Sequence, residues 1–185
     1  MRLRDKCIDL LYKAATGSRR GRNILTPVGA LVFFCLIALV LLASYWLDNL
    51  LKLPTIIPRP YNLALSVPFL FAGVVLALWC NLLFLKAKGT PVPLNPPKSL
   101  IVTGPYAITR NPMLTGSFSG LFGIGVLMNS FFLMFVFTPL LVLLAVLELK
   151  YIEEPELEKR FGQSYIAYRK SVPMVFPSLK RKNMK

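Results

Sequence analysis

Residues able to bind a charged ligand are concentrated in two polar stretches of an otherwise apolar chain, at 98–116 and 153–165. In the first, the side-chain amide of Asn111 suits hydrogen bonding to an amide edge or a carboxylate of a ligand. The aromatic ring of Tyr106, in the same stretch, suits packing against a planar ring. The second opens with a glutamate pair, of which Glu153 is suited to accept from ribose hydroxyls or to pair with an ammonium. Together they predict a site for a ligand that carries both charges and hydroxyl groups.

Each of these features also has a purely structural interpretation. Acidic residues just before Pro155 fit the first turn of a helix, where they complement the helix dipole. Arg110, in the first stretch, could extend its guanidinium to the membrane surface rather than bind a ligand. The small residues between Gly116 and Gly125 fit close packing of two helices.

Composition excludes several other kinds of site. The chain has no histidine, the commonest metal ligand and general base, and its three cysteines show no paired spacing, so a metal or disulfide framework is not expected. The net charge of +14 does not indicate nucleic-acid binding, because the basic residues gather at the two ends and in one loop. Charged residues make up 16%, against about 25% in soluble domains, which indicates lipid as the solvent for much of the surface.

Four apolar runs must position the polar stretches. The length and late start of the first run favour a transmembrane helix over a cleaved signal peptide, and a hydrocarbon core needs about 20 apolar residues. We expect an all-α membrane protein with about four transmembrane helices at 27–47, 63–85, 113–128 and 131–149. The uncharged Asn129-Ser130 predicts a tight hairpin between the last two, which returns both polar stretches to one side.

The charges predict which side that is. Four spans place the N-terminus, the second loop and the C-terminus together, and these hold 20 of the 22 Lys and Arg residues. The positive-inside rule assigns this side to the cytoplasm, in the inner or cell membrane if the chain is bacterial. Residues 1–185 are expected to form one integral membrane domain. Amphipathic helices are expected in the basic interfacial segment 1–23, for which a disordered basic tail is the alternative, and in the tail from 151 to 177.

The sequence here resembles the isoprenylcysteine carboxyl methyltransferase-like family, which groups with phospholipid methyltransferases. The resemblance covers roughly 98–177. It rests on the pattern Leu-x-x-x-Gly-x-Tyr-x-x-x-Arg-(His/Asn)-Pro-Met from Leu100 to Met113, followed by Gly116. It continues with Glu-Glu-x-x-Leu-x-x-x-Phe-Gly-x-x-Tyr-x-x-Tyr from Glu153 to Tyr168, and closes with Val-Pro and Phe-Pro pairs at 172–173 and 176–177.

The resemblance implies a methyltransferase that uses S-adenosylmethionine, bound at the cytoplasmic ends of the spans. It implies catalytic roles for Arg110 and Glu153. The cofactor-binding residues that it implies lie in the segments 98–116 and 151–177, and are Lys98, Ser99, Leu100, Ile101, Tyr106, Asn111, Pro112, Met113, Leu114, Glu153 and Glu154. The acceptor is expected to be a membrane lipid or lipid-like molecule, such as a lipid amine, an isoprenoid-linked group or a hydrophobic thiol.

Three departures from the family pattern bear on this expectation. Asn111 stands where many members have His, and Leu114 stands where Tyr is usual. Leu149 occupies the position of an Arg that suits a prenylcysteine carboxylate, so that acceptor is disfavoured. Two alternatives to the enzyme remain. One is a non-enzymatic lipid-binding or assembly protein that retains the fold, and the other is a membrane reductase.

Overall fold

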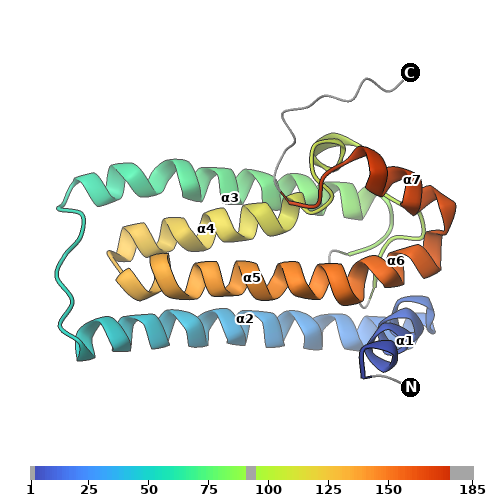
Figure 1. Cartoon of the computed structure of the whole chain (residues 1–185), viewed down its shortest axis with the longest axis horizontal. Coiled ribbons are helices and arrows are strands. Elements are labelled where there is room, and N and C mark those ends of the chain that lie inside the picture. Colours follow the sequence, from blue (N-terminus) through green and yellow to red (C-terminus); the bar gives the residue numbers. More distant parts are fainter. Residues whose placement is uncertain (1–2, 91–94, 176–185) are drawn as a thin grey trace.

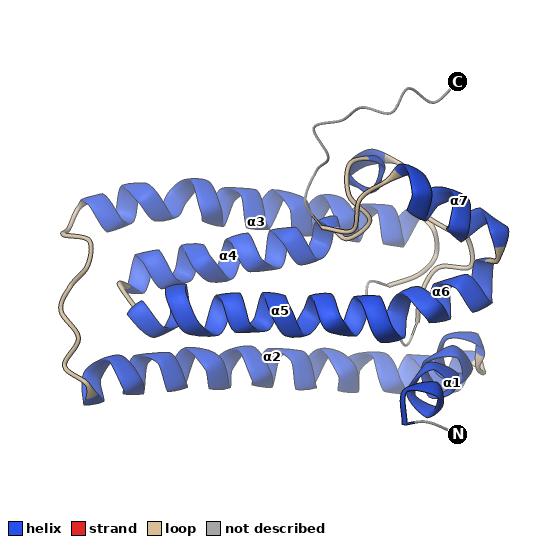
Figure 2. Ribbon diagram, in the orientation of Figure 1, coloured by secondary structure: helices blue, strands red, loops and turns tan. Residues whose placement is uncertain are grey.

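A computed structural model describes residues 3–90 and 95–175, and all regular structure within these residues is helical (Figures 1 and 2). The closing Phe-Pro pair at 176–177 lies outside them. The elements in chain order are α1 (Leu3–Thr16), α2 (Arg19–Leu50), α3 (Tyr61–Lys86), a 3-10 turn η1 (Gly104–Ala107), α4 (Pro112–Met128), a π-turn η2 (Leu133–Phe137), α5 (Thr138–Glu148), a second π-turn η3 (Leu149–Glu153), α6 (Glu154–Phe161) and α7 (Gln163–Ser171).

Three helices are long and apolar enough to cross a membrane: Thr26–Leu50 within α2, Tyr61–Lys86, and the continuous helix Leu133–Phe161. The third predicted span is the shorter apolar helix α4, whose 17 residues measure about 26 Å. A hydrocarbon core is about 30 Å thick, so α4 falls slightly short of it. The expectation of an all-helical membrane protein is confirmed, with three long spans and one shorter apolar helix.

Helices α3 and α4 pack closely against each other at glycine residues, where no side chain separates the two backbones. A Cβ added to Gly73 would lie 2.9 Å from the carbonyl oxygen of Gly116 and 2.9 Å from the Cα of Gly120. The hydroxyl of Ser119 also donates a hydrogen bond across the pair, to the carbonyl of Phe69 at 3.0 Å. These contacts confirm the packing role expected of the small residues in α4.

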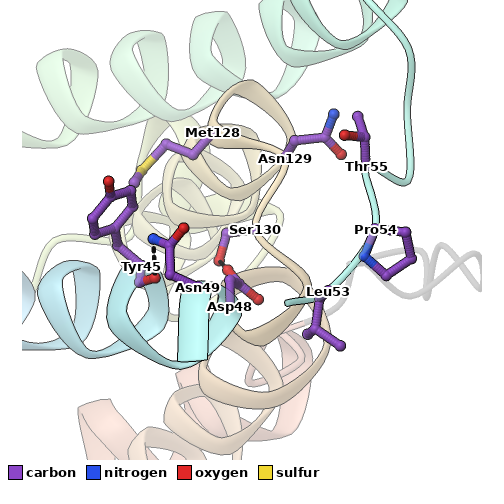
Figure 3. A pocket seen from close by; sticks show the side chains of 9 residues that line it. All are labelled: Tyr45, Asp48, Asn49, Leu53, Pro54, Thr55, Met128, Asn129 and Ser130. Atoms are coloured by element: carbon purple, nitrogen blue, oxygen red, sulfur yellow. Dashed lines mark hydrogen bonds between the residues drawn. The ribbon is translucent and has the colours of Figure 1, made fainter. Parts of the chain in front are cut away.

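The end of the bundle far from the polar stretches is held by a polar network (Figure 3). Asn129 ends α4 with φ 57, and its side-chain oxygen accepts from the backbone amide of Ile56 at 3.0 Å. The Asp48 carboxylate at the end of α2 accepts from the Ser130 hydroxyl and from the amide of Phe132. The predicted tight hairpin is therefore present, and it is tied both to α2 and to the loop that follows α2.

Both π-turns precede a proline by two residues, Pro139 in one case and Pro155 in the other. A proline inside a helix has no amide donor, and its ring clashes with the carbonyl of the residue four positions earlier. In each turn the helix widens to hydrogen bonds between residues five apart, as from Glu154 to Leu149. As expected, α6 begins at Glu154 with Pro155 in its first turn, but the preceding helix runs into it without a break. No free helix N-terminus is therefore left for the glutamates to complement.

The C-terminal tail is not one helix. Gly162 ends α6 with φ 57 and ψ −131, a conformation that favours glycine, and α7 leaves in a new direction (Figure 1). The tail from 151, which was expected to be amphipathic, is therefore divided into the two helices α6 and α7. Both α7 and α1 lie at the end of the bundle where α6 ends (Figure 1).

Candidate functional site

A cavity of about 770 Å³ lies at this end of the bundle, a volume typical of small-molecule sites. Its walls come from α1, α2, α3, the segment before α4, α4 itself, the helix α5–α6 and α7. The two polar stretches thus meet around one space although 36 residues of the chain, 117–152, separate them.

Most of the residues predicted for the site line this cavity. They are Ser99, Leu100, Ile101, Tyr106, Arg110, Asn111, Met113, Leu114, Glu153 and Glu154. The two exceptions are Lys98, whose side chain is exposed, and Pro112, which is fully buried at the start of α4. Among the described residues no group of His, Cys, Asp and Glu is arranged to hold a metal ion.

Arg110 joins three parts of the site. Its Nη2 lies 2.5 Å from Oε1 of Glu154, and both side chains are only 8% exposed. Its Nη1 donates to the carbonyl of Arg169 in α7 at 2.8 Å. The alternative interpretation, in which Arg110 extends to the membrane surface, is therefore wrong. Its Nε is buried and has no hydrogen-bond partner among the described residues, which leaves one donor free for a ligand.

Hydrogen bonds hold the segment after α7 against the start of α4. The Thr109 hydroxyl and the Asn111 amide nitrogen both donate to the carbonyl of Met174, each at 3.0 Å. The backbone amide of Arg110 donates to the carbonyl of Pro173 at 2.8 Å. The Asn111 amide thus has a structural partner that the sequence did not predict, although the residue also lines the cavity.

The aromatic wall is built around Tyr106. Its ring packs edge-on against Phe84 of α3 with centroids 6.0 Å apart, and its carbonyl accepts from the Tyr168 hydroxyl at 2.6 Å. Burial raises the pKa of Tyr106, Tyr165 and Tyr168 well above the usual value for a phenol. The three phenols therefore remain neutral donors and are not candidate bases at physiological pH.

Several lining residues were not predicted. Glu156 and Arg160 form an ion pair at 3.3 Å with side chains 3% and 15% exposed. Their spacing of four residues on a helix was a usable signal. Glu148, at the end of α5, also lines the cavity. A carboxylate that ends an apolar run is costly near lipid, which was a second usable signal.

Helix α2 supplies the wall nearest to lipid. Phe33 and Phe34 line the cavity, yet their side chains are 50% and 67% exposed. Residues that are both exposed and cavity-lining mark a mouth, and these two lie within the span Thr26–Leu50. Ala145 and Glu148 of α5 also line the cavity. The exposed phenylalanines therefore place an opening of the cavity at α2, toward the surface that lipid would cover.

The charges around the cavity are unbalanced. Four glutamates line it against two arginines, and both arginines are already paired with glutamates. Glu148 and Glu153 form no ion pair with a described residue within 4.0 Å. The free carboxylates favour a ligand that carries positive charge, and the Nε of Arg110 provides one donor for an acidic group.

In a comparison with known protein families, the family model for phospholipid methyltransferase matches residues 61–164 of the chain. The matched region includes α3, α4, the first polar stretch and the second as far as residue 164, and leaves α1 and α2 outside. No curated protein and no solved structure matches the chain.

Proposed function

Because the chain belongs to the phospholipid methyltransferase family, we propose that it is an S-adenosylmethionine-dependent methyltransferase that acts on an acceptor embedded in the membrane. Membership of the family implies methyl transfer in general. The identity of the cofactor and the nature of the acceptor are what we propose beyond it. The observation that carries it is the cavity, which gathers the two polar stretches and also opens at α2 toward the surface that lipid would cover.

The residues of the cavity suit this cofactor. Its methionyl part has an ammonium and a carboxylate, and its sulfonium is positively charged and carries an electrophilic methyl group. Free carboxylates such as Glu153 would bind its cationic or ribose groups, and the Nε of Arg110 would bind its carboxylate. We assign the adenosyl and methionyl contacts to Ser99–Ile101, Tyr106 and the segment 111–114. Leu114 adds an apolar wall where related chains have an aromatic one.

The role of the protein in such a reaction is mainly placement. A methyl group bound to sulfonium needs no acid catalyst, so alignment of the acceptor with the methyl supplies much of the acceleration. The rigid wall formed by α4 and the clamp from Arg110 to α7 would hold the cofactor pocket in shape. Burial of the site by α7 would exclude water from the donor.

Charge and position limit the acceptor. Leu149 is 6% exposed at the position where an arginine would pair with a carboxylate substrate, and Glu148 lies beside it. A negatively charged acceptor group would therefore be poorly compensated. A lipid amine, or a neutral thiol or isoprenoid-linked group, fits better. The opening at α2 would give such a molecule a sideways path from the bilayer.

We also propose that the cavity faces the cytoplasm of a cell in whose inner or plasma membrane the protein resides. The support is the charge asymmetry: 20 of the 22 Lys and Arg residues lie in segments assigned to the cavity side. That orientation would give the cavity access to cytoplasmic S-adenosylmethionine.

The test is binding of S-adenosylhomocysteine to purified protein in lipid nanodiscs, measured by calorimetry. We expect one site per chain, and a loss of at least tenfold in affinity for Glu153→Gln, since about 1.4 kcal/mol of charge interaction is tenfold. Glu158→Gln is the matched control, because its carboxylate pairs with Arg169 and does not line the cavity. No heat with the wild-type protein would refute the proposal.

A second candidate function is a lipid-binding or assembly protein that has kept the fold. Two observations favour it: Leu114 and Leu149 replace functional side chains of the family pattern, and Arg110 and Asn111 are used in structural hydrogen bonds. Such a protein would bind lipid in the cavity and give no response to S-adenosylhomocysteine.

A further inference from the structure

Helix α1 has two chemically different faces. Leu11 lines the cavity, and Ala15, one turn further on, is 5% exposed. On the opposite face Lys6, Leu10 and Lys13 are all exposed, and Leu10 is 67% exposed. Their spacing of four and then three residues places them in one row along the helix. One face of α1 therefore closes part of the cavity, and the other presents a leucine between two ammonium groups.

The polar part of the contact between α1 and the bundle is an exposed ion pair. The Asp9 carboxylate accepts from Nζ of Lys159 in α6 at 2.6 Å, and this ammonium also lies 4.5 Å from the ring centroid of Tyr12. The hydrogen bond from Lys159 holds the pKa of Asp9 below its usual range. Both partners of the ion pair are partly exposed, at 46% and 35%, and such pairs contribute little to stability.

The joint between α1 and α2 is short. Gly17 ends α1 where a Cβ would lie 2.8 Å from the carbonyl oxygen of Lys13. The Ser18 hydroxyl then caps α2 by accepting from the amide of Gly21 at 3.3 Å. The span Thr26–Leu50 begins ten residues after α1 ends at Thr16, so α1 is held near the level at which α2 enters the membrane.

We propose that α1 is a lid over the cavity that an anionic bilayer surface holds closed, with the Lys6–Leu10–Lys13 face bound to lipid phosphates and the Leu11 face docked on α6. The partner is a membrane rich in anionic phospholipid, because two ammonium groups beside an exposed leucine match a surface of phosphates over acyl chains. The closing of the cofactor site rests on the proposed function, whereas the lipid-dependent docking does not.

The size of the effect follows from the two lysines. Attraction of each to an anionic surface changes the docking equilibrium about fivefold, so both together change it by up to about 25-fold. A shift of about 25-fold takes the lid from mostly open to mostly closed where the open state is favoured about fivefold without anionic lipid.

The protein contains its own reporter for the lid. Cys7 lies in α1 on the side of Leu11, whereas Cys35 and Cys80 lie within membrane-spanning helices. The experiment measures labelling of Cys7 by an uncharged hydrophilic maleimide in nanodiscs. Discs of phosphatidylcholine alone are compared with discs that also contain phosphatidylglycerol. We expect phosphatidylglycerol to slow labelling by up to about 25-fold.

Three variants decide the cause. Lys6→Gln/Lys13→Gln should abolish the effect of phosphatidylglycerol, whereas Lys86→Gln/Lys170→Gln, which removes the same charge from α3 and α7, should retain it. Leu11→Gln places a polar group on the docked face of α1 and leaves the lipid-facing row intact, so it should speed labelling even in anionic discs. Unchanged protection in Leu11→Gln would show that lipid alone shields Cys7, and would overturn the lid.

The affinity for S-adenosylhomocysteine separates this inference from the proposed function. With the lid and the cofactor site both correct, phosphatidylglycerol raises the affinity in parallel with the protection of Cys7. If no disc supports binding while Cys7 protection follows the predicted pattern, the cofactor proposal fails and the lid stands. If binding is equal in both discs and Cys7 labelling does not respond to lipid, the lid is refuted.

Discussion

Replacing Arg110 by alanine should destabilise the protein more than the loss of a ligand contact would. The change leaves the Glu154 carboxylate, 8% exposed, without its cationic partner at 2.5 Å, and the carbonyl of Arg169 without its donor. Removing one member of a buried ion pair costs about 3–5 kcal/mol, because the remaining charge stays desolvated. We therefore expect Arg110→Ala to lower the free energy of unfolding by about that amount.

A double-mutant cycle with Glu154→Gln tests the physical cause. If the cost comes from an unpaired buried charge, the double variant loses much less than the sum of the two single variants. Thermal unfolding in detergent, followed by circular dichroism, measures all four proteins. Wild-type stability of Arg110→Ala, or strictly additive losses, would refute the clamp. Such a result would instead favour an arginine whose side chain serves only the ligand.

Three further predictions concern packing, protonation and the acceptor. Gly73→Ala should lower stability by about 1–3 kcal/mol, because its Cβ meets backbone of α4 at 2.9 Å. Gly120→Ala, whose nearest contact is 4.0 Å, should be tolerated in the same unfolding assay, and equal losses would contradict the predicted packing. Unfolded phenols ionise near pH 10 while Tyr106, Tyr165 and Tyr168 remain neutral when folded, so stability should fall as pH rises past about 10. Tyrosinate absorbance should then show these three ionising only on unfolding, and their early ionisation would disprove their burial. Glu148→Gln should reduce methyl transfer to an amine lipid relative to a neutral thiol without changing affinity for S-adenosylhomocysteine, and equal loss with both acceptors would exclude a charge-selective role.

Hydropathy and charge predicted the membrane helices because lipid imposes a simple rule on length and composition. The hairpin at Asn129 followed from the absence of charge between two apolar runs. The π-turns were not predicted from the sequence. Pro155 can either begin a helix or widen one that already precedes it, and the sequence alone does not decide between the two. The change of direction at Gly162 was not predicted, because the spacing of Phe161, Tyr165 and Tyr168 also fits a single helix.

The site was predictable where short motifs carry it and unpredictable where distant contacts do. Glu153 and Tyr106 belong to local patterns, and both line the cavity. The pairing of Arg110 with Glu154 spans 44 residues, and no spacing rule connects them. The contribution of α2 was also hidden, because a helix that is apolar all round gives no signal for the face that lines a cavity.

The most direct test of the central claim is transfer of a labelled methyl group from S-adenosylmethionine to a total membrane lipid extract, catalysed by the protein in nanodiscs and read by mass spectrometry. We predict label in one class of hydrophobic acceptor with an amine, thiol or isoprenoid-linked group, and its loss in Glu153→Gln. No labelled lipid from a protein that binds S-adenosylhomocysteine, or label that persists unchanged in Glu153→Gln, would contradict the account.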